Sequence, residues 1–383
     1  MKKIAIITLT GYFNYGNRLQ NYALQEILQS YGFTVDTIKV GRRVYQPKKK
    51  NKNILNKIKR VKNKSLTDLF NLMLLKTWGK YKKNRFNKFE MMRTKSFKEF
   101  TQKYINETDY FISEENIPKN LVEEYDFFIV GSDQVWNPHF NLEKSIYFLN
   151  FVPKQKRLTY APSFGVTELP EEYVDEYKKG LSGFNKLTIR ERSGVVLIEK
   201  LTRKEVDILI DPTMLLDKEE WLKIAKEPKF KPSGRYILNY FLGKVKKEDN
   251  EIIKKISKVY KLKIIDMASM NDLQNHIIGP SEFISYINSA KIIFTDSFHG
   301  VIFSILFRKP FVVFDRNTES GYSMGTRFNT LLSIFDLENR RKENIKSIKE
   351  IMGIDYTNIP IILERERQKS YQYIKNSLKI KNY

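Results

Sequence analysis

The sequence contains no cysteine and only three histidines. The absence of cysteine excludes disulfides, thiolate metal sites and a cysteine nucleophile, and it suits a reducing compartment. No apolar run approaches the roughly 18 residues that a membrane-spanning helix requires, and the chain opens on a strand-like segment in place of a basic-then-apolar leader. We therefore expect a soluble, cytoplasmic protein.

Three ligand-binding signatures are also missing. No two glycines stand two positions apart, so the dinucleotide fingerprint G-x-G-x-x-G cannot occur, and neither a G-K-[ST] phosphate loop nor a D-x-D metal signature is present. These absences argue against a dinucleotide oxidoreductase, a P-loop NTPase and a D-x-D metal-dependent transferase. A transferase that uses no metal and no cofactor remains compatible with the sequence.

The pattern of apolar segments predicts an α/β protein with two domains. A chain of 383 residues with 41% hydrophobic residues is too long for one core and has material for two. It opens with a strand at 1–10, a helix that begins near 19 and a strand at 35–40, which is typical of a parallel sheet. Further strands are expected at 125–130, 157–161, 187–190, 206–210, 236–240, 262–267, 291–295 and 311–314.

We place the domain boundary near 180–183, where an acidic helical segment ends. The expected units are an N-terminal α/β domain at 1–180, a C-terminal α/β domain at 181–345 and a helical tail at 346–383. Each domain is expected to be Rossmann-like. The carboxyl ends of parallel strands bind ligands in such sheets, so a cleft between the two domains is the expected site.

The basic excess is concentrated in one insertion at about 41–105. Residues 41–103 contain 21 basic and three acidic residues, so this segment carries +18 of the formal net charge of +24. No nucleic-acid-binding signature accompanies this charge, so we expect no nucleic-acid partner. Two interpretations stay open: helices packed on the first domain with solvated lysines, or a helix on an anionic membrane surface. The apolar residues of such a helix are Ile54, Leu55, Ile58, Val61, Leu66, Leu69, Phe70, Leu72, Met73 and Trp78.

His299 is the strongest candidate for chemistry. It follows the apolar strand at 291–295 and begins an apolar helix that runs to Phe307. Backbone N–H groups at a helix amino end favour an anion. A histidine there can bind an acidic substrate and act as its acid. The alternative is that His299 has only a structural role, as a helix cap or as a side chain packed in the core.

Two arginines and a set of polar residues stand at other strand or helix ends. Arg190 ends a strand and Arg327 begins a helix, where a guanidinium can clamp a carboxylate or phosphate. A structural ion pair with Glu191 or another acid explains Arg190 equally well, and a solvated arginine in the first turn of a helix explains Arg327 equally well. Amides and a carboxylate in two loops of the first domain suit a sugar, although the same residues are ordinary in turns. These candidates are Asn14, Asn17, Gln20, Ser132, Asp133 and Gln134.

Five motifs in order resemble the polysaccharide pyruvyl transferase family. They are Asn14-Tyr-Gly-Asn17, Val130-Gly-Ser-Asp-Gln-Val-Trp-Asn-Pro138, Ile189-Arg-Glu-Arg-Ser193, Asp211-Pro-Thr213 and Thr295-Asp-Ser-Phe-His-Gly300. The resemblance implies a two-domain fold similar to GT-B glycosyltransferases. It implies phosphoenolpyruvate as donor, and a ketal-linked pyruvate on two hydroxyls of one sugar in a cell-surface polysaccharide or its precursor.

The resemblance also implies roles for individual residues. His299 matches the family's general acid and Arg190 its donor-binding arginine, while Arg327 is a looser match, and Ser297 and Gly300 belong to the same donor site. Better-known members carry an arginine where this chain has Ser297. Either Arg327 or another basic residue supplies the positive charge of the missing arginine, or the donor is not phosphoenolpyruvate.

We assign Asp133 as the base toward a saccharide acceptor. A lipid-linked acceptor would place the protein at the inner face of the plasma membrane. A glycosyltransferase that uses a nucleotide sugar and a non-catalytic, polyanion-binding relative are the alternatives.

Overall fold

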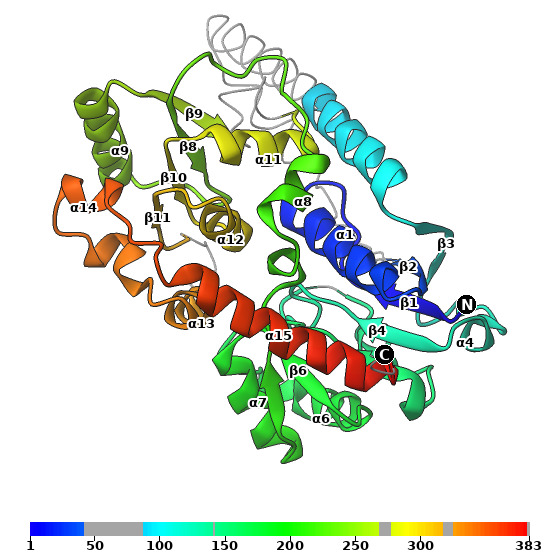
Figure 1. Ribbon diagram of the computed structural model, residues 1–383. Helices are drawn as coiled ribbons and strands as arrows, with labels where there is room; N and C mark the ends of the chain where they lie inside the picture. Colours follow the sequence, from blue (N-terminus) through cyan, green and yellow to red (C-terminus); the bar gives the residue numbers. More distant parts are fainter. Residues whose placement is uncertain (42–86, 141, 268–276, 317–324, 381–383) are drawn as a thin grey trace, which may run out of the picture.

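The computed structural model of the chain describes residues 1–41, 87–140, 142–267, 277–316 and 325–380. Two α/β units lie against each other, and helices surround the sheet of each unit (Figure 1). Every strand pair in these sheets is parallel, which confirms the predicted α/β class. The first sheet has the order β3-β2-β1-β4-β5, with β1 at Lys3–Ile7, β2 at Thr34–Val40, β3 at Glu107–Ile112, β4 at Phe127–Val130 and β5 at Arg157–Thr159.

The central strand β1 is apolar because both of its faces are covered. Ile4, Ala5, Ile6 and Ile7 are fully buried, as a parallel sheet with helices on both faces requires. Helix α1 (Tyr15–Ser30) begins earlier than the apolar spacing indicated, because the Asn14 side chain caps it by accepting from the backbone N–H of Asn17. The expected polar turn therefore ends at Asn14.

The second sheet has the order β11-β10-β8-β9. Its strands are β8 (Tyr236–Tyr240), β9 (Lys263–Met267), β10 (Ile292–Thr295) and β11 (Phe311–Val313). The helices that follow these strands or pack beside them are α9 (Lys247–Tyr260), α11 (Pro280–Ser289), α12 (Phe298–Leu306) and α13 (Thr326–Ile334). The other helices are α4 (Leu121–Glu124), α5 (Lys144–Tyr147), α6 (Val174–Ser182), α7 (Arg192–Thr202), α8 (Lys218–Lys223), α14 (Ile348–Met352) and α15 (Ile359–Leu378).

A two-stranded sheet, β6 (Leu187–Ile189) with β7 (Val206–Ile208), extends the first unit. The Thr188 hydroxyl accepts from the backbone N–H of Ala161, and the N–H of Arg190 donates to the Pro162 carbonyl, both at 3.0 Å. Apolar residues of β6 share one core cluster with β1 and β4. We therefore place the boundary between β7 and β8, and the expected boundary at 180–183 falls inside the first unit.

Helix α15 crosses from the second unit to the first (Figure 1, red). Its Tyr373 hydroxyl donates to the Thr159 carbonyl of β5 at 2.8 Å, and Arg367 Nε donates to the Met214 carbonyl at 2.7 Å. The helical tail thus packs on the edge of the first sheet and on the segment that joins the units.

The described end of the basic insertion, residues 87–104, is helical and packs on the folded units. Phe97 and Phe100 are buried in the cluster that also contains α1 and α11. Arg93 donates to the Phe13 carbonyl and the Ser96 hydroxyl to the Ile277 carbonyl, both at 2.9 Å. The apolar residues at 54–78 lie outside the described residues, so the membrane interpretation stays a prediction.

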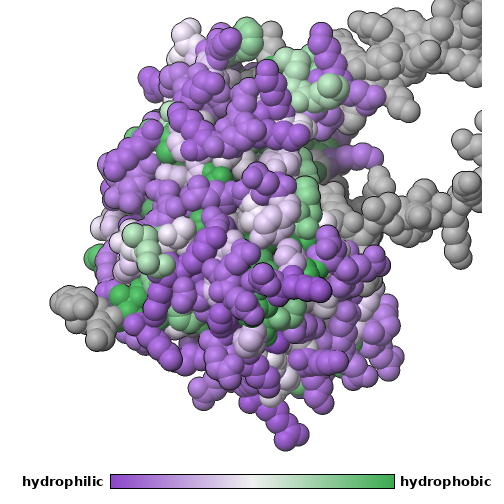
Figure 2. All heavy atoms as spheres, turned by 90° about the vertical axis from the view of Figure 1, so that its right-hand side faces the viewer, coloured by the Kyte–Doolittle hydropathy of each residue, from purple (hydrophilic) through white to green (hydrophobic). Residues whose placement is uncertain are grey.

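Hydrophilic residues cover most of the face shown in Figure 2, and apolar residues are scattered on it. Among the residues with a described position, no helix is long and apolar enough to cross a membrane.

Candidate active site

His299 lies in the first turn of α12, at the contact between the two units. It is 5% exposed, and its imidazole packs directly over Gly16 in the first turn of α1. A Cβ atom built on Gly16 would lie 1.9 Å from Nδ1 of His299, so only glycine leaves room for the ring. The amino ends of α12 and α1 therefore meet at this histidine, and both favour negative charge.

Asp211 is the anionic partner of His299. It follows β7 and caps the short 3₁₀ helix Pro212–Met214. Its Oδ2 lies 3.5 Å from His299 Nε2, accepts from Arg190 Nη1 at 2.5 Å and accepts from the Ser132 hydroxyl at 2.9 Å. Burial raises the pKa of Asp211, but His299 and Arg190 lower it more, so this pKa lies below its usual range and the carboxylate is ionised.

Arg190 and Arg327 come together from different units. Their guanidinium carbons lie 4.3 Å and 5.4 Å from the ring centroid of Phe298, the residue before the acid. Burial, and then the positive charge of Arg190, lowers the pKa of Arg327 to about 9. Two buried guanidiniums near one ring favour an anion between them.

The loop after β4 brings Asp133 and Ser132 to the same place. Asp133 has a φ of 78° and accepts from the Asn17 side-chain amide of α1 and, at 2.8 Å, from the backbone N–H of Gln134. Its Oδ1 lies 3.8 Å from Arg190 Nη2. The structure thus groups His299, Arg190, Arg327, Asp133, Ser132 and Asn17.

Three of the candidate sugar-binding residues make local contacts. Gln20 donates to the Thr8 hydroxyl at 2.9 Å and to the Asn17 carbonyl at 3.1 Å, and Asn14 caps α1. Gln134 packs against Gly165, where a Cβ would lie 2.1 Å from its side-chain nitrogen. These contacts account for Gln20 and Asn14 without a ligand.

Ser297 and Gly300 support α12, the helix that carries His299. The Ser297 hydroxyl accepts from the backbone N–H of Gly300 at 3.4 Å and caps α12. A Cβ on Gly300 would lie 2.5 Å from the Thr295 hydroxyl, so the glycine lets α12 approach β10. Both residues therefore have a structural role beside the donor role that we expect from the sequence.

Several buried donors at the centre of this group have no hydrogen-bond partner within the described ranges. They are Nε and Nη2 of Arg190 and Nε2 of His299. Buried polar atoms are nearly always bonded, so a water molecule or a ligand that accepts hydrogen bonds is the expected partner of these donors.

Comparisons with known proteins identify the family of the chain. A family model described as polysaccharide pyruvyl transferase matches residues 14–318. The chain belongs to the polysaccharide pyruvyl transferase family. The matched range contains every candidate residue except Arg327, which lies beyond its end. A search of curated proteins found no match to this pyruvyl transferase.

Solved structures share its fold at low sequence identity. A UDP-N-acetylglucosamine 2-epimerase aligns over 100% of this chain and 98% of its own, with a TM-score of 0.50 and 9% identity. The UDP-GlcNAc 2-epimerase from Neisseria meningitidis aligns over 100% of both chains, with a TM-score of 0.49 and 11% identity. A glycosyltransferase from Rickettsia africae ESF-5 aligns over 99% of this chain and 100% of its own, with a TM-score of 0.47 and 11% identity. The chain has an α/β, GT-B-like fold, as its sequence predicted.

Glu191, the neighbour of Arg190 in the sequence, does not pair with it. Its Oε1 accepts from the Ser163 hydroxyl and the backbone N–H of Phe164, both at 2.9 Å, and from the N–H of Gly165 at 3.2 Å. Glu191 therefore fixes the loop after β5. The ion pair expected for Arg190 forms with Asp211.

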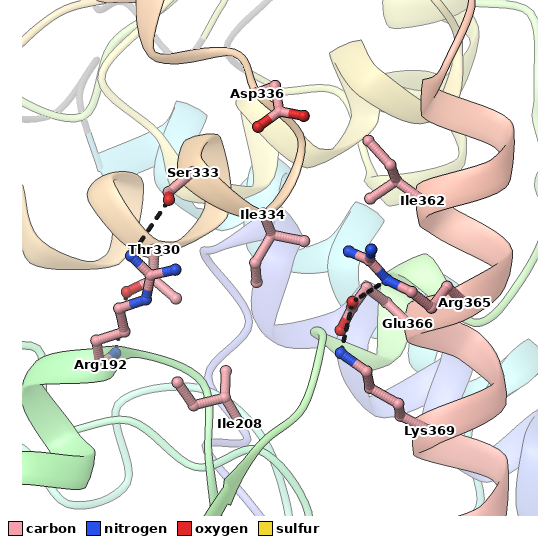
Figure 3. A pocket seen from close by; sticks show the side chains of 10 residues that line it. All are labelled: Arg192, Ile208, Thr330, Ser333, Ile334, Asp336, Ile362, Arg365, Glu366 and Lys369. Carbon is pink, nitrogen blue, oxygen red and sulfur yellow. Dashed lines mark hydrogen bonds and ion pairs between the residues drawn. The ribbon is translucent and has the colours of Figure 1, made fainter.

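A pocket of about 380 Å³ lies between α7, α13 and α15, and His299 is not among the residues that line it (Figure 3). Its cations are already bonded: Arg365 and Lys369 both donate to Glu366, at 3.0 Å and 2.7 Å, and Arg192 donates to the Ser333 hydroxyl at 3.2 Å. No candidate site residue lines this pocket. In the part of the chain with assigned positions, no group of three or more His, Cys, Asp or Glu could hold a metal ion.

Proposed function

We propose that this pyruvyl transferase uses phosphoenolpyruvate as donor and forms a ketal-linked pyruvate on two hydroxyls of one sugar, without a metal or cofactor. Family membership supports the reaction class. The observation that carries the choice of donor is the buried pair of Arg190 and Arg327 beside His299, with unsatisfied donors on Arg190 and His299. Phosphoenolpyruvate offers a carboxylate and a phosphate, which are the groups that guanidinium binds best.

The residues have separate roles in the proposed reaction. His299 gives a proton to C3 of phosphoenolpyruvate as the double-bond electrons form the C–H bond, which leaves C2 electrophilic. One acceptor hydroxyl adds to C2, and its proton passes to Asp133. The second hydroxyl adds as the bond from C2 to the phosphate oxygen breaks, with its electron pair leaving on phosphate.

The protons balance over the cycle. The proton of the second hydroxyl returns to His299, and the one held by Asp133 leaves on phosphate. Arg190 and Arg327 stabilise the negative charge that develops on the leaving phosphate. No other reactant is required.

Arg327 supports phosphoenolpyruvate as donor even though Ser297 replaces the arginine of better-known members. Its guanidinium approaches the same Phe298 ring as that of Arg190, from a different helix. We infer that it supplies the second positive charge that the 297 position lacks.

The acceptor is proposed to be a saccharide of a cell-surface polysaccharide or its lipid-linked precursor, bound by the amides near Asp133. This places the reaction in the cytoplasm, at the inner face of the plasma membrane. Isothermal calorimetry with phosphoenolpyruvate and with UDP-sugars separates this donor from a nucleotide sugar, because only the true donor should bind.

Replacing the acid tests the mechanism. His299→Ala should lower turnover by about 10²- to 10⁴-fold, the usual contribution of general acid catalysis, while the protein stays folded. The product is followed by mass spectrometry as the gain of one pyruvate ketal on the saccharide. His139→Ala, at an exposed position, is the matched control and should keep full activity. Undiminished turnover by His299→Ala would remove this residue from the mechanism.

A further inference from the structure

Asp211 has two oxygens with different tasks. Oδ1 accepts from the backbone N–H of Thr213 at 3.0 Å and from the Thr213 hydroxyl at 2.7 Å, which fixes the carboxylate in its own turn. Oδ2 points the other way and contacts Ser132, Arg190 and His299. One oxygen therefore anchors the group, and the other reaches three side chains of the candidate site.

The buried position of Asp211 makes its negative charge energetically costly, so other groups must stabilise that charge. Asp211 is 1% exposed, and a buried charge is costly unless it is paired and hydrogen-bonded. Four hydrogen bonds and the imidazole of His299 provide that compensation. The arrangement is directional, because the two donors from Thr213 leave Oδ2 no freedom to turn away from the site.

We propose that Asp211 is a positioning residue, which directs Nε2 of His299 and the guanidinium of Arg190 toward one donor molecule through a single carboxylate oxygen. This rests on the proposed function only for the identity of that donor. Asp211 itself neither touches the substrate nor exchanges a proton with it. It contacts the imidazole at Nε2, the nitrogen proposed to give the proton, and so holds the ring in one orientation beside Arg190.

Other charged groups surround the imidazole and must be considered with Asp211. Arg190 at the end of β6 and Arg327 on α13 oppose a positive ring, and Asp133 in the loop after β4 favours one. The packed first turn of α1 presents Gly16 to the ring. Among the acidic groups of the described residues, Asp211 is the one that forms an ion pair with Nε2, at 3.5 Å.

Asp211→Asn removes the negative charge of the side chain while nearly keeping its shape, so it tests the role of the charge. The amide oxygen can still accept from Arg190 and Ser132, which keeps the arginine in place, while the amide NH2 replaces Oδ1 and leaves the backbone N–H of Thr213 without its acceptor. The negative charge beside His299 is lost. We therefore expect kcat to fall by about 10²- to 10³-fold, while KM for phosphoenolpyruvate changes by less than about threefold.

A second readout does not depend on any substrate. The chain has three histidines, so NMR of labelled ring nitrogens gives few signals, and the His299 signals are those missing from His299→Gln. Asp211→Asn should move the Nε2 signal of His299, because it changes the group that lies 3.5 Å from this nitrogen. Asp249→Asn is the matched control: Asp249 is also a buried carboxylate, paired with Lys342 in the second unit, and its loss should leave both kcat and the His299 signals unchanged.

Thr213→Val provides a milder test if Asp211→Asn does not fold, as judged by circular dichroism. It removes one hydrogen bond to Oδ1 and leaves the charge, so kcat should fall by up to about tenfold, again without a rise in KM.

The outcomes are distinct. A lower kcat with unchanged KM and a moved Nε2 signal supports the proposal. The proposal is overturned if the Nε2 signal does not move, or if Asp211→Asn raises KM and leaves kcat unchanged. If wild-type protein turns over no phosphoenolpyruvate but Asp211→Asn still moves the signal, the proposed function fails and the positioning role of Asp211 stands.

Discussion

Gly16→Ala tests whether the contact between the units sets the position of the acid. The added methyl group would lie 1.9 Å from Nδ1 and 2.4 Å from two carbons of the His299 ring. An ordinary contact begins at 3.4 Å, so the ring must retreat by about 1.5 Å. Its neighbours are buried on every side, which leaves movement of α12 relative to α1 as the way to make room.

The expected effect on activity is large, and the effect on stability is small. A misplacement of about 1 Å at a reacting group can cost about 10²-fold in rate, so kcat/KM should fall by at least that factor. Overpacking costs about 1–3 kcal/mol, and the better helix propensity of alanine offsets about 1 kcal/mol of it. The free energy of unfolding should therefore fall by no more than about 2 kcal/mol.

Gly180→Ala is the matched control. Gly180 also lies in a helix, and a Cβ there would lie 2.3 Å from the Phe148 ring, far from the acid. This variant should lose similar stability in thermal unfolding and keep its kcat/KM for pyruvyl transfer. If Gly16→Ala is as active as Gly180→Ala, the position of His299 does not depend on Gly16 and the reasoning is refuted.

Two further predictions concern buried carboxylates. Glu191→Ala leaves two backbone N–H groups and the Ser163 hydroxyl without their acceptor, and should lower the free energy of unfolding in denaturant by about 3 kcal/mol; an unchanged midpoint would contradict this. Burial raises the pKa of Asp211, but His299 and Arg190 hold it below the ordinary value of 3.8. Its ionised form therefore stabilises the fold above that value, and this stability is lost as the pH falls below it. The free energy of unfolding should therefore fall less steeply at low pH in Asp211→Asn than in the wild-type protein. The same pH dependence in both proteins would show the inference to be wrong.

The buried strands could be predicted from the sequence because they are continuous apolar runs between polar turns. Residues 236–240 form β8 as predicted, and β10 and α12 lie where the apolar segments around His299 indicated. β3 was not predicted. It is a mostly exposed edge strand, and its sequence Glu-Thr-Asp-Tyr-Phe-Ile has no apolar alternation that would reveal it. Its pairing with β2 depends on tertiary contact.

The site was predictable where the local pattern carries the chemistry. His299 and Arg190 stand at a helix start and a strand end, and the structure brings them together with Asp133. Asp211 had no predicted role, because an Asp-Pro pair after a strand is ordinary turn chemistry. Its function depends on burial and on a partner far along the chain, and neither is visible in the sequence.

The division of the site between the units has a consequence for binding. Arg190 belongs to the first unit and Arg327 to the second, and the charge of each opposes the charge of the other. A donor with a carboxylate and a phosphate between them replaces this repulsion with two attractions. Because a ligand shifts an equilibrium by its differential affinity for the two states, such a donor favours the contact between the units. The same contact places Gly16 against His299, so, if phosphoenolpyruvate is the donor, we expect its binding to be coupled to the placement of His299 through this interface.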